Sequence, residues 1–167
     1  MSLPITEQPR TEVEWLDVAD VPLAAIRYDG ITQDALVTCF DEGFNALRAA
    51  IEAGVVVPAG SPLAVYHGDP SATFDAEIAF PVVTPLTSES EHAGLVVRPS
   101  VVAGGRYATV THVGGYDGLG PAWGGLLGAV AAAGAQPEHR FVEVYVTEPS
   151  PEADPATMRT ELFAPVR

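Results

Sequence analysis

The feature that most constrains this sequence is an internal repeat, in which one arrangement of residues occurs twice. Residues 63–70 align without a gap on residues 142–149, and both segments hold a tyrosine at the same place and end in an acid–proline pair. Residues 75–82 align in the same way on residues 159–166, and both end in Pro-Val. Each copy of such a unit leaves a hydrophobic face that the other copy buries. The repeat predicts one domain, residues 12–167, built from two halves about a pseudo-twofold axis.

Hydrophobic periodicity gives each half the order strand, strand, helix, strand, strand. Alternating or β-branched segments predict strands at 13–18, 22–28, 63–67, 73–80, 96–103, 106–113, 141–147 and 158–164. Apolar residues three and four apart predict helices at 32–53 and 122–133, each followed by a glycine. We therefore expect an α+β fold whose halves, about 12–82 and 95–166, form one antiparallel sheet. Both helices are expected on one face, with a groove at the pseudo-twofold axis on the uncovered face.

Two segments lie outside this pattern. Residues 1–11 hold two prolines and show no periodicity, which predicts a flexible tail. Residues 83–94 are polar and are expected to connect the halves.

The first helix carries one apolar stripe, formed by Leu36, Phe40, Phe44, Leu47 and Ile51. We expect this stripe to pack on the valine side of the sheet, because a row of valines suits contact with a helix. The expected partners are Val65, Ile78, Val142 and Val144.

The strand at 141–147 carries Glu143 and Tyr145 on the side opposite its valines. An acid on an aromatic floor suits a cationic or aromatic small molecule, although an ordinary solvated strand face has the same pattern. The repeat favours the first interpretation, because the tyrosine has a counterpart, Tyr66, whereas the acid is replaced by Ala64. A residue needed for the fold would be wanted in both halves, so Glu143 is a candidate binding residue.

The charge of the chain argues against polyanionic partners. The sequence has 22 acidic residues against 8 basic ones, a net charge of −14, and no lysine. Few groups can therefore neutralise phosphates, so binding to nucleic acid or to an anionic membrane is not expected. The sequence contains no apolar run long enough to span a bilayer and no secretory signal. Cys39 is its single cysteine. These features predict a cytoplasmic protein.

The sequence also lacks the patterns of common cofactor and nucleophile sites. Its four histidines show no metal-ligand spacing, and neither a phosphate-binding loop nor a dinucleotide fingerprint is present. No Gly-x-Ser-x-Gly turn occurs, and Cys39 lies on the apolar side of the first helix. No metal and no cofactor are expected.

Taken together, the duplicated units, the Glu-x-Tyr-x-Thr-x-Pro run from Glu143 and the final acid-x-x-x-Pro-Val resemble the GyrI-like small-molecule-binding domains. This domain also forms the effector-binding half of multidrug-responsive regulators. The resemblance covers about residues 12–167, and His112-Val-Gly-Gly-Tyr116 and Trp123 support it. It implies a stand-alone domain, because the chain has no room for an N-terminal DNA-binding module.

The resemblance implies that Glu143 meets a cationic, aromatic ligand, with walls formed by Tyr145, Tyr116, Trp123 and Tyr66. Three functions remain open. The first is binding of a hydrophobic, cationic or electrophilic small molecule for sensing, sequestration or detoxification. The second is hydrolysis of a cyclopropane-bearing or similar electrophilic genotoxin, with Glu143 as acid or base and Tyr116 or Tyr145 holding the substrate oxygen. The third is modulation of a topoisomerase through a protein interface.

Overall fold

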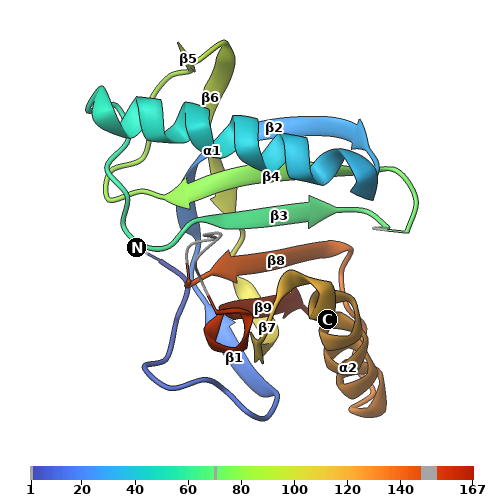
Figure 1. The fold of residues 1–167 in the computed structure, drawn as a ribbon. Coiled ribbons are helices and arrows are strands. Elements are labelled where there is room, and N and C mark those ends of the chain that lie inside the picture. The colour runs from blue at the N-terminus through green and yellow to red at the C-terminus, as the bar shows by residue number, and fades with distance from the viewer. Residues whose placement is uncertain (1, 70, 148–153) are drawn as a thin grey trace.

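The computed structural model describes residues 2–69, 71–147 and 154–167, and these form a single antiparallel sheet of nine strands with two α-helices (Figure 1). The strands are β1 (Glu14–Val18), β2 (Val21–Ile31), β3 (Leu63–His67), β4 (Phe74–Pro81), β5 (Ser90–His92), β6 (Leu95–Val102), β7 (Gly105–Val113), β8 (Arg140–Tyr145) and β9 (Arg159–Pro165). The helices are α1 (Leu36–Glu52) and α2 (Leu119–Ala132). The expected α+β fold with an antiparallel sheet is confirmed.

The strands of the two halves follow equivalent orders outward from the centre of the sheet, and β5 is an additional strand at one edge. Outward from the central pair β3–β8 lie β4, β2 and β6 on one side and β9, β7 and β1 on the other. The first strand of each half pairs with the other half, because β1 pairs with β7 and β6 pairs with β2. Tyr66 and Tyr145 lie on the same face, with their hydroxyl oxygens 3.2 Å apart. The arrangement agrees with a duplication, while Pro70 and Pro149, which the repeat also matches, lie outside the described residues.

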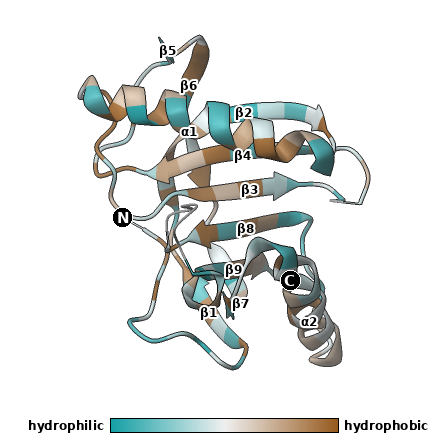
Figure 2. Cartoon of the chain, viewed as in Figure 1, coloured by the Kyte–Doolittle hydropathy of each residue, from teal (hydrophilic) through white to brown (hydrophobic). Residues whose placement is uncertain are grey.

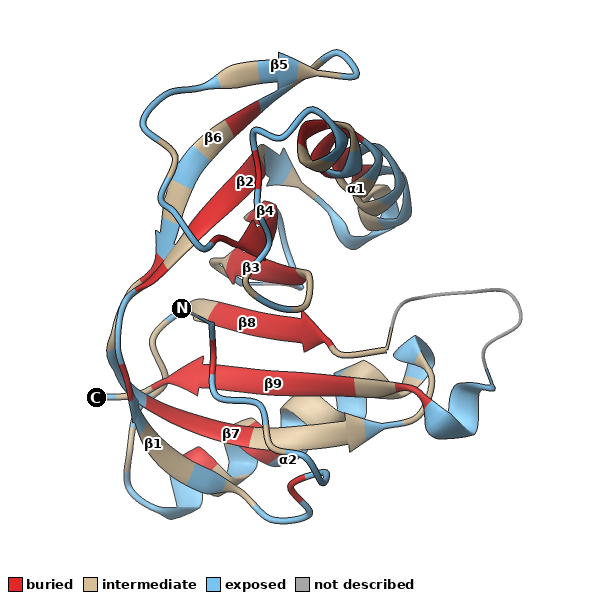
Figure 3. Cartoon of the chain, turned by 90° about the vertical axis from the view of Figure 1, so that its left-hand side faces the viewer, coloured by how far each residue is buried: buried red, intermediate tan, exposed pale blue. Residues whose placement is uncertain are grey.

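Both helices cover the face of the sheet that carries Tyr66 and Tyr145. Helix α1 packs on β4 and β2, and α2 packs on β7 and β9 (Figure 1). In Figure 2, teal and brown alternate along α1, whereas α2 shows little teal, in keeping with its sequence of mainly Ala, Gly and Leu. Buried residues concentrate in β3, β4, β8 and β9 (Figure 3).

The expected contact between the helix stripe and the valines is wrong. Leu47 and Ile78 do share the helix-side core, but Val65, Val142 and Val144 lie in a separate core on the opposite face. There the valines pack with Leu3, Leu23, Tyr107 and Phe163, so the N-terminal segment and the sheet's own large side chains bury them. The groove predicted on a helix-free face is therefore also misplaced, because the helices cover the side that carries Glu143.

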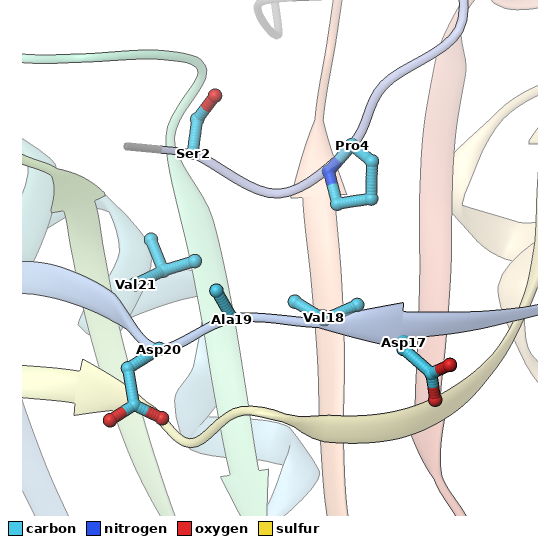
Figure 4. A pocket seen from close by; sticks show the side chains of 7 residues that line it. All are labelled: Ser2, Pro4, Asp17, Val18, Ala19, Asp20 and Val21. Carbon is cyan, nitrogen blue, oxygen red and sulfur yellow. The ribbon is translucent and has the colours of Figure 1, made fainter.

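The first residues of the chain are packed rather than free, contrary to the expectation of a flexible tail. Leu3 is 3% exposed and Arg10 is 5% exposed. Figure 4 shows Pro4 of this segment directed toward Val18, and Ser2, Pro4, Val18 and Val21 line a cleft of about 210 Å³. The Arg159 guanidinium donates to the carbonyl of Thr6, and the Arg10 backbone exchanges hydrogen bonds with Thr111. These contacts join residues more than a hundred positions apart, so no local pattern predicts them.

Two smaller differences concern element boundaries. The chain between the halves contains a short strand, β5, which the polar composition of residues 83–94 conceals. Helix α1 is preceded by a single 3-10 turn, Gln33–Ala35, and Thr32 makes no side-chain cap. Neither helix of the described chain is long and apolar enough to cross a membrane.

We expect replacement of Leu47 by alanine to lower the free energy of unfolding by about 2–5 kcal/mol, because the side chain is fully buried and its removal leaves a cavity. Denaturant unfolding measures the loss. The matched control is Val37→Ala on the same helix, since Val37 is 71% exposed and its truncation should change stability by about 0.5 kcal/mol or less. A loss below about 1 kcal/mol for Leu47→Ala would contradict the assigned core.

Candidate functional site

Glu143 lies at the centre of the sheet, in the strand next to the pseudo-twofold axis. Its Cα is opposite Ala64 of β3 on one side and Leu162 of β9 on the other. Strand alternation places the side chain on the helix-covered face together with Phe141 and Tyr145. Glu143 is only 6% exposed, so its carboxylate is buried.

Three neutral groups donate hydrogen bonds to this carboxylate. The Tyr145 hydroxyl lies 2.7 Å and the Tyr66 hydroxyl 3.1 Å from Oε1. The indole Nε1 of Trp123, on α2, lies 2.7 Å from Oε2. An indole N–H is only a donor, so Oε2 must be an acceptor. The site therefore holds a carboxylate group in place from both central strands and one helix.

The two tyrosines remain donors over a wide pH range. Burial, reinforced by the nearby Glu143 charge, raises the pKa of Tyr66 and of Tyr145 well above the ordinary value. A phenol whose pKa is raised keeps its proton. These hydroxyls can therefore stabilise an oxyanion or the Glu143 carboxylate without becoming charged.

The electrostatic setting of Glu143 differs from that of the other two buried glutamates. Glu77 accepts hydrogen bonds from Ser100 and lies 3.1 Å from His67 Nε2. Glu161 is bound by the Arg159 guanidinium, 2.7 Å away, and pairs with Arg10 as well. For Glu143, none of the ion pairs found in the described part of the chain supplies a positive charge. A buried carboxylate with neutral partners alone leaves room for an external cation.

Aromatic rings surround the carboxylate and its donors. Phe40 of α1 and Tyr116 both meet the Tyr145 ring edge to face, with ring centroids 5.7 and 5.9 Å apart. Trp123 contacts Phe141 in the same way at 5.3 Å. Tyr116 is 39% exposed, so it marks the side of the cluster that faces solvent. Aromatic faces of this kind attract organic cations.

Tyr116 lies in a turn that a hydrogen bond from His112 stabilises. Nε2 of His112 lies 2.8 Å from the carbonyl oxygen of Gly115. A Cβ atom at Gly118 would come within 2.8 Å of the His112 ring, so only glycine fits there. The glycine of the His112-Val-Gly-Gly-Tyr116 segment that corresponds to the pattern, Gly114, has a backbone φ of +140°, which favours glycine, and a Cβ there would lie 3.4 Å from the His112 ring.

The structure brings all five predicted site residues together. Tyr66, Tyr145 and Trp123 contact the Glu143 carboxylate directly, and Tyr116 reaches it through Tyr145. Sequence reasoning missed Phe40, which it assigned to the core stripe alone, and the supporting role of His112. The strand pattern also gave no sign that Glu77 and Glu161 are buried, Glu77 beside His67 and Ser100 and Glu161 in an ion pair with Arg159.

Among the described residues, no group of three or more His, Cys, Asp or Glu side chains is arranged to hold a metal ion.

Comparison with known proteins gives the family. Residues 11–167 match the model of the GyrI-like small molecule binding domain. The chain belongs to the GyrI-like family. No curated protein matches it in sequence.

Solved structures show the same GyrI-like fold at low sequence identity. The C-terminal domain of EcmrR is 18% identical, with a TM-score of 0.75 over 93% of this chain and 97% of that one. SAV2435, solved with bound tetraphenylphosphonium, is 12% identical, with a TM-score of 0.67 over 94% of each chain. A hydrolase from Listeria innocua is 15% identical, with a TM-score of 0.64 over 96% of this chain and 94% of that one.

An alkaline titration tests the tyrosine environment. Burial raises the pKa of each of the five tyrosines, that of Tyr28 to about 12 and those of Tyr66 and Tyr145 well above the ordinary value. Because the unfolded chain loses these protons at about pH 10 while the folded chain keeps them, stability should fall as the pH rises above that value. Tyrosinate absorbance should therefore appear together with unfolding, monitored by circular dichroism. Ionisation of several tyrosines at about pH 10 in the folded protein would contradict this environment.

Proposed function

We propose that this GyrI-like domain binds hydrophobic organic cations at Glu143, for sensing, sequestration or detoxification. The observation that carries the proposal is the buried carboxylate of Glu143, which three neutral donors hold and which no positive side chain of the described residues pairs. A cation that reaches this carboxylate gains charge pairing in a site of low dielectric, and the surrounding rings favour its positive charge and its apolar surface. The ligand approaches the carboxylate from the side on which Tyr116 is exposed.

Binding requires a local exchange of partners. Because Trp123 and the two tyrosines already occupy the carboxylate oxygens, the cation must replace part of this hydrogen bonding or share it. The indole is the donor at Oε2 and comes from α2, outside the two central strands. Movement of Trp123 therefore opens the carboxylate with the least change in the sheet.

The test is a direct comparison of a cation with a neutral molecule that keeps three of its four phenyl rings. Tetraphenylphosphonium, which is bound to the structural neighbour SAV2435, and neutral triphenylphosphine oxide are titrated into the protein by calorimetry. We expect the phosphonium to bind at least about tenfold more tightly, the scale of one charge-assisted contact. Displacement or shielding of Trp123 should also change tryptophan fluorescence. Equal affinities for the two compounds would overturn the proposal.

Hydrolysis of an electrophile is a second candidate, favoured by one specific contact. The protonated Tyr145 hydroxyl lies 2.7 Å from a carboxylate oxygen of Glu143, so a base and a hydrogen-bond donor for a substrate oxygen stand side by side. Glu143 would take a proton from water as the water oxygen attacks a carbon of a strained ring. As the ring bond breaks, its electron pair passes to the carbonyl that activates the ring, and the carbonyl oxygen takes the proton from Glu143. Tyr145 or Tyr116 would hold the substrate oxygen during this step.

A further inference from the structure

Thr160, the second residue of β9, has a hydroxyl group without a hydrogen-bond partner. The side chain is 1% exposed, and no atom of the described residues satisfies its Oγ1. Burying a hydroxyl without a partner opposes folding. A polar group kept under these conditions next to a binding site therefore points to a partner that arrives with the ligand.

The register of the sheet places Thr160 beside the Glu143 cluster. Its Cα is opposite Tyr145 of β8 and opposite His112 of β7. Leu162 and Ala164 of the same strand lie in the core beneath α2, so alternation puts Thr160 on this helix-covered face as well. Directly opposed residues have Cβ atoms about 5 Å apart. Thr160 is thus the nearest cross-strand neighbour of Tyr145 on β9.

The polar groups around Thr160 are already used. The Tyr145 hydroxyl donates to Glu143, and Nε2 of His112 is bonded to the Gly115 carbonyl. The ring of Tyr116 contacts that of Tyr145 and is exposed on its other side. The Thr160 hydroxyl therefore remains available beside Tyr145.

We propose that Thr160 is a specificity-determining residue, which forms a hydrogen bond with a polar group of the bound cation. The inference rests on the proposed function and names its ligand class: hydrophobic cations that carry a hydroxyl or a comparable hydrogen-bonding group, rather than purely hydrocarbon cations. A site with such a group favours the ligand that pairs it, because an analogue without the partner leaves the buried hydroxyl unsatisfied.

The test uses two phosphonium probes of nearly equal shape. In (hydroxymethylphenyl)triphenylphosphonium a hydroxyl stands where (ethylphenyl)triphenylphosphonium has a methyl group, and each is used as its ortho, meta and para isomers. Thr160→Val removes the threonine hydroxyl and keeps its shape. Thr109→Val is the matched control, because Thr109 is 0% exposed with an equally unpartnered hydroxyl. Its neighbours in the strand place it on the opposite face, with Tyr107.

We expect at least one hydroxymethyl isomer to bind about 3- to 10-fold more tightly than its ethyl counterpart, the scale of one net hydrogen bond. The ratio should fall to about 1 in Thr160→Val and persist in Thr109→Val. Both variants should melt no lower than the parent protein, because each replaces an unpartnered hydroxyl with a methyl group.

Different results would overturn the role of Thr160 and the proposed function. If no hydroxymethyl isomer gains affinity, or if the gain survives in Thr160→Val, the role of Thr160 is overturned while binding of cations stands. If neither type of phosphonium binds, the proposed function is overturned and the role of Thr160 with it.

Discussion

Replacement of Arg10 by alanine should lower the free energy of unfolding by about 3 kcal/mol. The Arg10 side chain is 3% exposed and its Nη1 lies 3.6 Å from Glu161 Oε2, whose side chain is fully buried. Removing one partner of a buried pair leaves an uncompensated charge, which costs about 3–5 kcal/mol. The lower end of this range applies, because Arg159 and Thr111 still bind Glu161 in the variant.

The matched control for Arg10→Ala is Arg106→Ala on strand β7. Arg106 pairs with Asp17 at 3.4 Å, but both side chains are more than half exposed. Exposed pairs of this kind contribute about 0–1 kcal/mol. Denaturant unfolding of both variants measures the difference. Similar losses in the two proteins would mean that the N-terminal segment is not held by its buried arginine.

Local order was the part of this fold that the sequence predicted well. Alternating residues such as those of 141–147 and the stripe from Leu36 to Ile51 report strand and helix directly, because burial of one face imposes their period. The repeat adds the grouping of these elements into halves. It also brought Tyr66 and Tyr145 to one face, where the structure places them.

Long-range packing was the part that the sequence did not predict. A strand with valines on one side and Glu143 and Tyr145 on the other can be buried on both sides, and its pattern does not say which side the helices cover. The contacts of Phe40 with Tyr145 and of Trp123 with Glu143 place the helices on the aromatic side of β8. Arg10 pairs with Glu161, which lies 151 positions later in the sequence. Whether the Thr160 hydroxyl finds a hydrogen-bond partner depends on the register of β7, β8 and β9.

Replacement of Glu143 by glutamine should distinguish a binding site from a catalytic one. The change removes the charge and keeps the size of the side chain. If the domain binds cations, the affinity for tetraphenylphosphonium should fall by about 1–3 kcal/mol, the scale of a charge-assisted contact. Neutral triphenylphosphine oxide should be far less affected, since its binding does not depend on the charge.

The matched control for this change is Glu77→Gln. It removes one charge from an equally buried glutamate of the same sheet, which is 5% exposed against 6% for Glu143. Glu77 lies on the opposite face, beside His67 and Ser100. Affinity for the phosphonium should therefore persist in Glu77→Gln, and a similar loss in both variants would reduce the effect to the overall charge of the protein.

If the site is catalytic, Glu143→Gln should have a different signature. An amide cannot take a proton from water, so turnover of a strained electrophile should fall by about 100-fold or more, while binding of the substrate is largely kept. The Tyr145 hydroxyl, which keeps its proton because burial raises its pKa, would remain a hydrogen-bond donor for the substrate oxygen in the variant. Titration and product assay on the same protein separate the two results. A variant with unchanged affinity and unchanged turnover would contradict both functions, because the buried carboxylate would then serve only to join β3, β8 and α2 through Tyr66, Tyr145 and Trp123.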